Sequence, residues 1–143
     1  MSASRAVTPS RRLGELWVVI SSKGYARVME AHSGLSALVV ETAAVESGDG
    51  LVEFDAIWES SLTDSATKGL PDASIVGVES RLHTVNEILH VTSKPLIVDG
   101  DTGGELAQFQ NLVSHLERLG VSAVIIEDKV FPKRNSLDAS ASQ

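Results

Sequence analysis

Cysteine is absent from the 143-residue sequence, and proline and aromatic residues are scarce, at 4 residues and 4%. Without cysteine the chain forms no disulfide or thiolate metal site and has no cysteine nucleophile. No apolar run approaches the roughly 20 residues that span a bilayer, so we expect a cytoplasmic protein with no membrane partner. The 12 Lys and Arg residues face 19 Asp and Glu, a net charge of −7. We expect no nucleic acid partner, because binding to phosphates needs clustered basic side chains.

Apolar residues make up 43% of the chain, enough to bury a core, and the length suits one domain or part of one. Four short apolar runs alternate with segments of helical period, which is typical of parallel β/α units. Strands are expected at 26–31, 54–59, 95–99 and 122–127, helices near 34–44, 78–91 and 105–119, and a loop between residues 59 and 78. Gly120 fits the end of the last helix.

The number of units predicts the fold class: α/β, with parallel β/α units that form the first half of a TIM-type (β/α)8 barrel. A complete barrel takes roughly 250 residues, and four βα units fit in residues 25–137. Residues 1–24 are expected to hold a leader and an N-terminal helix or extension, and residues 138–143 a disordered tail. The basic stretch before Glu15 is interpreted as a disordered leader or a frayed helix start, with an organelle transit peptide as the alternative. An exposed loop is expected at 46–52.

Each predicted strand is followed by polar side chains. They are Glu30 and His32, Glu59 and Ser60, Asp99 and Asp101, and Glu127 and Asp128. Because ligands bind beyond the carboxyl ends of the strands in parallel α/β proteins, all four groups should face one side of the molecule. The sequence therefore predicts a charged ligand site at that end of the sheet.

Asp99, Asp101 and Glu127 are candidate Mg²⁺ ligands within this site. Asp99 and Asp101 lie two residues apart, and the neighbouring glycines bend the chain into a loop where both carboxylates can converge. Hard oxygen ligands of this kind suit Mg²⁺, with water and substrate oxygens completing the coordination. The alternative is a solvated strand-end loop that caps the next helix. An Asp-x-Asp motif alone does not decide between the two.

Five motifs in a fixed order between residues 27 and 137 carry a resemblance to a known family. They are Met29-Glu30-Ala31-His32-Ser33-Gly34-Leu35-Ser36, Trp58-Glu59-Ser60-Ser61-Leu62, Lys68-Gly69-Leu70-Pro71-Asp72, Asp99-Gly100-Asp101-Thr102-Gly103, and Glu127-Asp128-Lys129 with Pro132-Lys133-Arg134-Asn135-Ser136-Leu137. This order resembles the amino-terminal half of the phosphoenolpyruvate mutases, which belong to the isocitrate lyase superfamily. Five motifs in order are far more specific than any one of them.

The resemblance implies roles for the metal and substrate residues. Asp99 is expected to contact Mg²⁺ directly, whereas Asp101 and Glu127 act mostly through water molecules on the metal. Backbone N–H groups in the turn that comprises Ser60, Ser61 and Leu62 are expected to bind the substrate carboxylate, and Trp58 to wall the site. Judged by its residue type alone, Trp58 is equally well explained by core packing.

The resemblance also implies catalytic residues. Asp72 matches a carboxylate that family members place beside the migrating phosphoryl group; the alternative is a polar residue in a Gly- and Pro-rich turn. Lys129, Lys133 and Asn135 match a mobile gating loop that excludes water; the alternative is a solvated tail. Water would capture the phosphoryl group and turn transfer into hydrolysis. Asn135 favours a mutase, because related phosphonopyruvate hydrolases tend to depart from the pattern there.

The four histidines are assigned no direct chemistry. His32 is expected to be a hydrogen-bonded structural residue, and a role in organising the site is the alternative. His83, His90 and His115 lie on predicted helices. We expect these three side chains to be exposed.

The resemblance implies a Mg²⁺-dependent enzyme that interconverts phosphoenolpyruvate and 3-phosphonopyruvate, the opening step of phosphonate biosynthesis. Two alternatives stay open: a phosphonopyruvate hydrolase, and a truncated, catalytically incomplete fragment that needs a partner half. The second follows because family members also use an arginine and a histidine from later strands. The superfamily's C–C lyases use a cysteine that this sequence lacks. The expected partners are the small-molecule substrate and, at the open sheet edges, further copies in a homo-oligomer or a complementary half-barrel.

Overall fold

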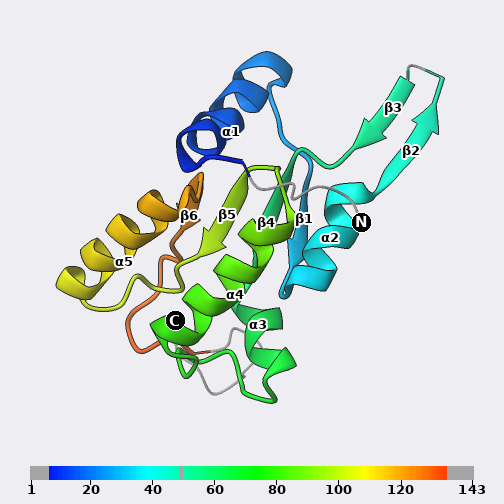
Figure 1. Cartoon of the computed structure of the whole chain (residues 1–143). Helices are drawn as coiled ribbons and strands as arrows, with labels where there is room; N and C mark the ends of the chain where they lie inside the picture. The colour runs from blue at the N-terminus through cyan, green and yellow to red at the C-terminus, as the bar shows by residue number, and fades with distance from the viewer. Residues whose placement is uncertain (1–6, 49, 135–143) are drawn as a thin grey trace.

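The centre of the computed structural model, which describes residues 7–48 and 50–134, is a four-stranded parallel sheet (Figure 1). The strand order is β1, β4, β5, β6, formed by Val28–Ala31, Ala56–Glu59, Leu96–Asp99 and Ala123–Ile125. Each strand lies inside the range predicted from its apolar run. The predicted parallel β/α units are therefore confirmed.

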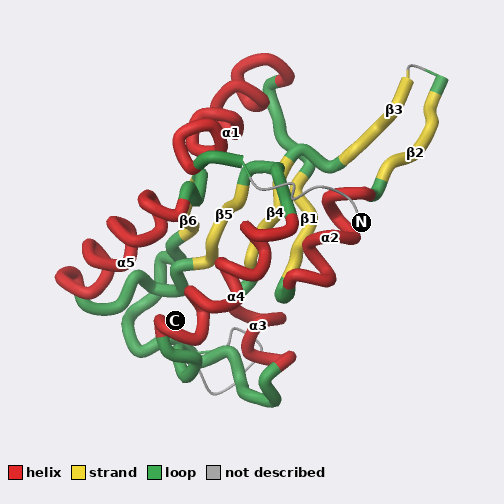
Figure 2. The backbone as a smooth tube through the Cα atoms, in the orientation of Figure 1, coloured by secondary structure: helices red, strands yellow, loops and turns green. Residues whose placement is uncertain are grey.

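The described residues form five helices, most of which pack on the sheet. They are α1 (Pro9–Lys23), α2 (Gly34–Thr42), α3 (Ser61–Thr67), α4 (Val78–Val91) and α5 (Leu106–Leu119). Helices α2, α4 and α5 follow β1, β4 and β5 and lie along one face of the sheet (Figure 2). Helices α4 and α5 match their predicted bounds to within one residue, because apolar side chains recur at helical spacing in both. Gly120 follows α5 with a φ of 88°, which glycine adopts without strain.

The strand register separates a helix-covered face from an opposite face. Paired residues in a ladder point to the same face, so Ala31, Glu59 and Val98 form one row against the helices. The next row, with Trp58 and Ile97, lies on the opposite face. The apolar core joins the helix-covered face to the helices and consists of Ala31, Ala37, Val40, Ile57, Val85, Ile88, Leu96, Val98, Leu116 and Val121. Asp99 is the last residue of β5 and comes two residues after Ile97, so its side chain lies on the same face of the sheet as that of Trp58.

The prediction of a loop at 46–52 is wrong for most of the segment, because residues 46–47 and 50–52 lie in the two strands of a β-hairpin, although the predicted exposure is observed. Strands β2 (Ala44–Ser47) and β3 (Gly50–Glu53) pair antiparallel, and the hairpin projects from the body in Figure 1. Val45 lies opposite Val52, and such β-branched pairs stabilise a ladder. The strands of the hairpin are mostly exposed, so no burial pattern marks them, and Gly, Asp and Glu are frequent in the sequence of residues 46–52.

The loop predicted between residues 59 and 78 contains a helix, α3. Its first helical hydrogen bond runs from the Asp64 N–H to the Ser60 carbonyl oxygen at 3.0 Å. Inside the helix, Asp64 is fully buried and pairs with Lys68 one turn later. A seven-residue helix rich in Ser and Thr has no apolar period, and its stability comes from tertiary contacts of this kind.

Helix α1 is anchored to the body by one buried arginine. Arg12 is 1% exposed, and its guanidinium donates to the carbonyl oxygens of Thr92 and Lys94 at 2.5 and 2.6 Å. These carbonyls follow the end of α4, where backbone acceptors lack helical partners. The basic stretch noted in the sequence is thus helical from Pro9 onward.

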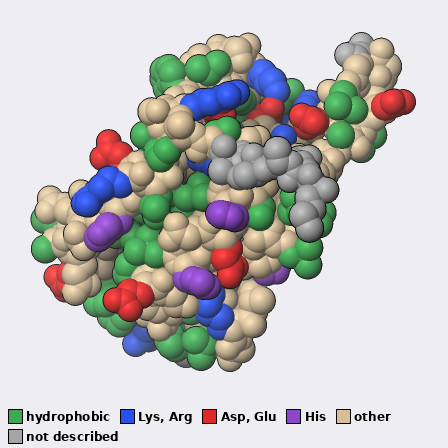
Figure 3. Space-filling view, viewed as in Figure 1, with side chains coloured by type: hydrophobic (Ala, Val, Ile, Leu, Met, Phe, Trp, Pro, Cys, Tyr) green, Lys and Arg blue, Asp and Glu red, His purple; other side chains and the backbone are tan. Residues whose placement is uncertain are grey.

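The surface over the helices mixes charged, histidine and apolar side chains (Figure 3). His83, His90 and His115 are exposed, as predicted from their helical positions. Among the described residues, no helix has the length and apolar character that crossing a membrane requires.

Replacing Arg12 should lower the free energy of unfolding strongly. Arg12→Met leaves buried carbonyl oxygens at the end of α4 without a donor, and we expect a loss of about 3 kcal/mol in urea denaturation. Arg11→Met is the matched control, because Arg11 is exposed and pairs with Glu15 on the helix surface; its cost should stay below about 0.5 kcal/mol. Equal effects of the two substitutions would contradict the anchoring role of Arg12.

Glu59 should make the protein less stable as the pH rises. It is fully buried in the helix-covered row, neither carboxylate oxygen has a hydrogen-bond partner among the described residues, and burial raises its pKa to about 8. Because the folded-state pKa exceeds the unfolded one, the contribution of Glu59 to stability is greatest below pH 4.5 and is lost as the pH rises toward 8.

Glu59→Gln removes this titration, so its stability relative to the unsubstituted protein should grow by up to about 4 kcal/mol between pH 5 and pH 8. Urea denaturation at both pH values measures the difference. Glu117→Gln, at an exposed position of α5, should show no such pH dependence. A constant difference for Glu59→Gln would mean that Glu59 is ionised in the folded protein.

Candidate active site

Acidic side chains meet a buried lysine beyond the carboxyl ends of β4, β5 and β6. Lys133 is 4% exposed, and its Nζ donates to Asp101 Oδ1 at 2.8 Å and to Asp72 Oδ1 at 3.0 Å. It also lies 3.2 Å from Glu127 Oε1 and donates to Ser61 Oγ at 3.0 Å. Three carboxylates and one hydroxyl from four separate segments therefore surround a single ammonium group.

The carboxylates keep Lys133 charged. Burial by itself lowers the pKa of the ammonium, but the hydrogen bonds that it donates to Asp101 and Asp72 outweigh burial and raise the pKa above its ordinary value. For Glu127 the balance is reversed in sign. Burial by itself raises the pKa of this carboxyl, but the contacts with Lys129 and Lys133 outweigh burial and bring the pKa below its ordinary value. The cluster is therefore a group of carboxylates arranged around one positive charge.

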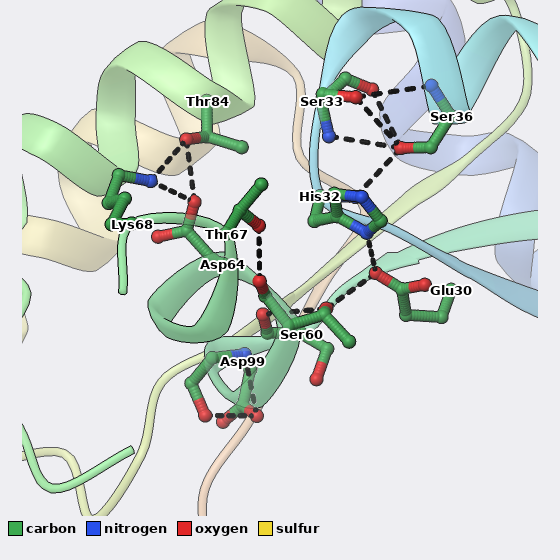
Figure 4. A network of polar contacts seen from close by, with 12 residues as sticks. Glu30, His32, Ser33, Ser36, Ser60, Asp64, Thr67, Lys68, Thr84 and Asp99 are labelled. Atoms are coloured by element: carbon green, nitrogen blue, oxygen red, sulfur yellow. Dashed lines mark hydrogen bonds and ion pairs between the residues drawn. The ribbon is translucent and has the colours of Figure 1, made fainter. Parts of the chain in front are cut away.

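Asp99 lies beside this cluster rather than within it. Its Oδ2 accepts hydrogen bonds from Ser61 N at 3.2 Å and Ser61 Oγ at 2.9 Å, and its Oδ1 accepts one from Asp101 N at 3.0 Å. Since Ser61 Oγ donates to Asp99 and accepts from Lys133, the serine links the aspartate to the ammonium. Figure 4 shows Asp99 next to the Ser60 turn at the start of α3.

A close backbone approach fixes the turn that carries Asp99 and Asp101. The Gly100 N–H donates to the Ile125 carbonyl oxygen of β6 at 2.8 Å. A Cβ at Gly100 would lie 2.9 Å from Val124 Cγ1 and 3.0 Å from that same oxygen. Only glycine fits there without a shift of the neighbouring strand, and the fit places both aspartates next to the strand that leads to Glu127.

The three predicted metal ligands lie in one region but do not converge on one point. Asp101 and Glu127 both face Lys133, whereas Asp99 faces Ser61. Within residues 7–48 and 50–134, no three Asp, Glu or His side chains are grouped closely enough to form a ready metal site. The centre between the carboxylates is where the ammonium of Lys133 lies.

The predicted substrate-binding residues lie on two sides of this cluster. Trp58 is half-buried on the same sheet face as Asp99, and its indole Nε1 has no hydrogen-bond partner among the described residues. Ser60 and Ser61 begin α3 and are buried, whereas the Leu62 side chain is 49% exposed. The N–H of Ser61 already donates to Asp99. The N–H of Leu62 lies in the first turn of α3, ahead of the residue that donates the first hydrogen bond of this helix.

The predicted gating-loop residues have different positions. Lys133 is buried in the cluster, as described above, and Lys129 lies outside it, 2.8 Å from Glu127 Oε2. Asn135, the position expected to separate mutases from hydrolases, lies outside the described residues.

A separate polar network contains His32, next to the end of β1. Its Nδ1 lies 2.9 Å from Glu30 Oε1, which also accepts a 2.5 Å hydrogen bond from Thr63 Oγ1 (Figure 4). The backbone N–H of His32 donates to Ser36 Oγ at 3.0 Å. His32 is thus a hydrogen-bonded residue that links β1 to α2 and α3, as expected.

Sequence reasoning missed one residue of the site, Arg81. This side chain from α4 is 6% exposed and lies 3.0 Å from Asp101 Oδ2. It lies in a helical segment of ordinary composition, Glu79-Ser80-Arg81-Leu82, and no local pattern distinguishes it from an exposed helical arginine.

Comparison with known proteins assigns the chain to a family. The family model described as phosphoenolpyruvate phosphomutase matches residues 19–143. A phosphoenolpyruvate phosphomutase of Tetrahymena pyriformis is 39% identical over 129 residues, which cover 90% of this chain and 40% of that protein.

Two solved structures are similar over most of the chain. The phosphoenolpyruvate phosphomutase from Streptomyces platensis subsp. rosaceus has a TM-score of 0.76 and 34% identity, and the match covers 92% of this chain and 42% of that one. A phosphonopyruvate hydrolase in complex with oxalate and Mg²⁺ has a TM-score of 0.73 and 33% identity, over 90% of this chain and 41% of that one.

The chain thus spans about 40% of the length of these relatives. Their similarity confirms the predicted fold class, in which the four β/α units correspond to the first half of a (β/α)8 barrel. Since the family model matches far more than half of its residues, the chain belongs to the phosphoenolpyruvate phosphomutase family.

Proposed function

We propose that this chain carries the metal- and substrate-binding half of a phosphoenolpyruvate mutase, which interconverts phosphoenolpyruvate and 3-phosphonopyruvate. The observation that supports this most is the cluster of carboxylates around one cationic group, beyond the carboxyl ends of β4 to β6. Such a cluster suits a divalent cation and a phosphorylated anion. The reaction would open a route to phosphonates.

Asp99, Asp101 and Glu127 are the residues that would hold Mg²⁺. Their chemistry fits, because all three are carboxylates, and Asp101 and Glu127 already bind a positive charge. The ammonium of Lys133 uses the same oxygens, so it must withdraw when a metal binds. Bound Mg²⁺ would neutralise the negative charge of a pyruvate enolate.

The residues around Ser60 would hold the substrate carboxylate. The N–H of Leu62 lies in the first turn of α3, before the first helical hydrogen bond, and Ser60 and Ser61 frame that turn. Backbone N–H groups in such a turn suit a carboxylate. Trp58, on the same sheet face as Asp99, would form a wall of the site.

Asp72, Lys133 and Asn135 would act on the phosphoryl group. Lys133 Nζ lies 3.0 and 2.9 Å from the two carboxylate oxygens of Asp72, so the segment that carries Lys133 already folds over Asp72. Lys129 extends this cover to Glu127. Exclusion of water by the covering segment would favour transfer to carbon over hydrolysis.

Phosphonopyruvate hydrolysis is the second candidate function. The hydrolase structure resembles this chain almost as well as the mutase structure, with TM-scores of 0.73 and 0.76. Because the chain spans about 40% of these relatives, a third proposal is that it needs a partner. That partner is a complementary half-barrel or another copy in a homo-oligomer, at the sheet edges β1 and β6.

Phosphorus NMR on 3-phosphonopyruvate with Mg²⁺ tests the proposed reaction. We expect a phosphoenolpyruvate signal to appear. Asp99→Ala should abolish it, whereas Asp128→Asn, at an exposed position beside Glu127, should retain it. Inorganic phosphate with pyruvate would instead support the hydrolase, and no conversion would support a chain that needs its partner half.

Metal affinity tests the proposed ligand set separately from turnover. Asp101→Asn should weaken Mg²⁺ binding by about tenfold or more in isothermal titration calorimetry. Lys133→Met should strengthen it by at least about fivefold, because a competing cation is removed from Asp101 and Glu127. Asp128→Asn should leave it unchanged. Unaltered affinity in Lys133→Met would show that the metal and the ammonium do not share these oxygens.

A further inference from the structure

We propose that Arg81 is a positioning residue that holds the side chain of Asp101 so that one carboxylate oxygen faces the cation site. The inference rests on the proposed function, in which Asp101 helps to hold Mg²⁺. It concerns a residue of α4 that lies outside the five sequence motifs.

A single guanidinium group holds both ends of the Asp99 to Asp101 turn. Arg81 Nη1 donates to the carbonyl oxygen of Asp99 at 2.5 Å and lies 3.0 Å from Asp101 Oδ2. Both side chains are largely buried, with exposed fractions of 7% for Arg81 and 15% for Asp101. Charge-assisted contacts of this kind are strong when they are shielded from water.

The two oxygens of Asp101 have separate partners. Oδ2 contacts Arg81, whereas Oδ1 accepts from Lys133 at 2.8 Å. Arg81 thus occupies the oxygen that faces away from the cluster and leaves the other oxygen to the cation. The Asp99 carbonyl oxygen and Asp101 Oδ2 both lie close to the same nitrogen, Nη1, so their directions are set by one rigid, planar guanidinium, whereas a lysine ammonium rotates freely on its flexible stem.

The backbone of Asp101 needs such support. Its φ is 53°, a left-handed conformation that costs a non-glycine residue on the order of 1 kcal/mol. Its N–H donates to Asp99 Oδ1 at 3.0 Å, and its carbonyl oxygen accepts from Glu127 N at 2.7 Å. These bonds hold the turn at its backbone, and Arg81 supplies the only side-chain contact to Oδ2 found in the described residues.

Space beside the turn makes this support necessary. Arg81, Asp101, Thr102 and Phe109 line a cavity of about 220 Å³. An Asp101 carboxylate released from Arg81 could turn into this cavity and solvate there, away from the cation site. Arg81 therefore decides which of two directions the carboxylate takes.

If Arg81 acted only as a counter-charge for Asp101, its loss would change the affinity for Mg²⁺ in the opposite direction from the loss of a positioning contact. Loss of a positive charge close to a cation site strengthens the binding of Mg²⁺, as predicted for Lys133. Loss of a positioning contact weakens it, because residues that orient metal ligands contribute about 10- to 100-fold in affinity. The sign of the change therefore distinguishes the two roles.

The experiment measures Mn²⁺ and Mg²⁺ binding by the full chain, with electron paramagnetic resonance and calorimetry. We expect Arg81→Gln to weaken metal binding by about tenfold. Arg81→Lys keeps the charge but not the planar guanidinium, and it should weaken binding by about threefold. Arg12→Gln is the matched control: it removes another buried arginine, distant from the site, and should lower stability without changing metal affinity. Unchanged or tighter binding by Arg81→Gln overturns the proposal.

Amide hydrogen exchange tests the positioning without any metal. Arg81→Gln should speed exchange at the N–H groups of Asp101 and Glu127 by about tenfold, while the Ile57 N–H, bonded to Pro95 within the sheet, keeps its rate. Equal protection of the turn in both proteins refutes the role of Arg81. If the unsubstituted chain binds no metal, the proposed function fails at its ligand set, yet this exchange result still decides on Arg81. Should Arg81→Gln fail to fold, Arg81→Lys replaces it in both measurements.

Discussion

Mutual repulsion among carboxylates is the constraint on which the site depends. Asp72, Asp101 and Glu127 lie around one point, with Asp99 adjacent, and burial raises the cost of such like charges. Positively charged side chains from distant segments of the sequence offset this repulsion. Lys133 lies 32 residues along the chain from Asp101 and 61 from Asp72. The acidic end of the barrel therefore holds together only when segments distant in the sequence have come together.

The two cations do different work. Lys133 lies between the carboxylates and contacts oxygens that a metal would also use. Under the proposed function, metal binding would therefore change the position of the segment that carries Lys133. Arg81 binds from behind, on the oxygen of Asp101 that faces away from the centre. Under the proposed function, a divalent ion would displace Lys133, whereas Arg81 would stay in place and keep the ligands in their arrangement.

Much of this arrangement could be predicted from the sequence, for reasons that differ between elements. The apolar runs before Glu59 and Asp99 marked buried strands, and the polar residues after them marked the ligand end, since both signals are local. The hairpin of β2 and β3 was missed because its exposed strands carry no burial pattern. Arg81 was missed because its partners, Asp99 and Asp101, lie about 20 residues away and no local spacing reveals them. That two of the predicted metal ligands, Asp101 and Glu127, would contact Lys133 depends on packing between segments, which motif order does not encode.

The anchoring of α1 has a consequence for how the chain acquires its fold. The acceptors of Arg12 lie 80 and 82 residues further along, and Ser122 Oγ donates to the Arg12 carbonyl oxygen across a separation of 110 residues. On the ribosome, Arg12 thus emerges long before the groups that it binds. Closing such long loops is slow because their entropy must be lost before the contacts form, so we expect the amino-terminal helix to dock late, after the sheet beneath it has assembled.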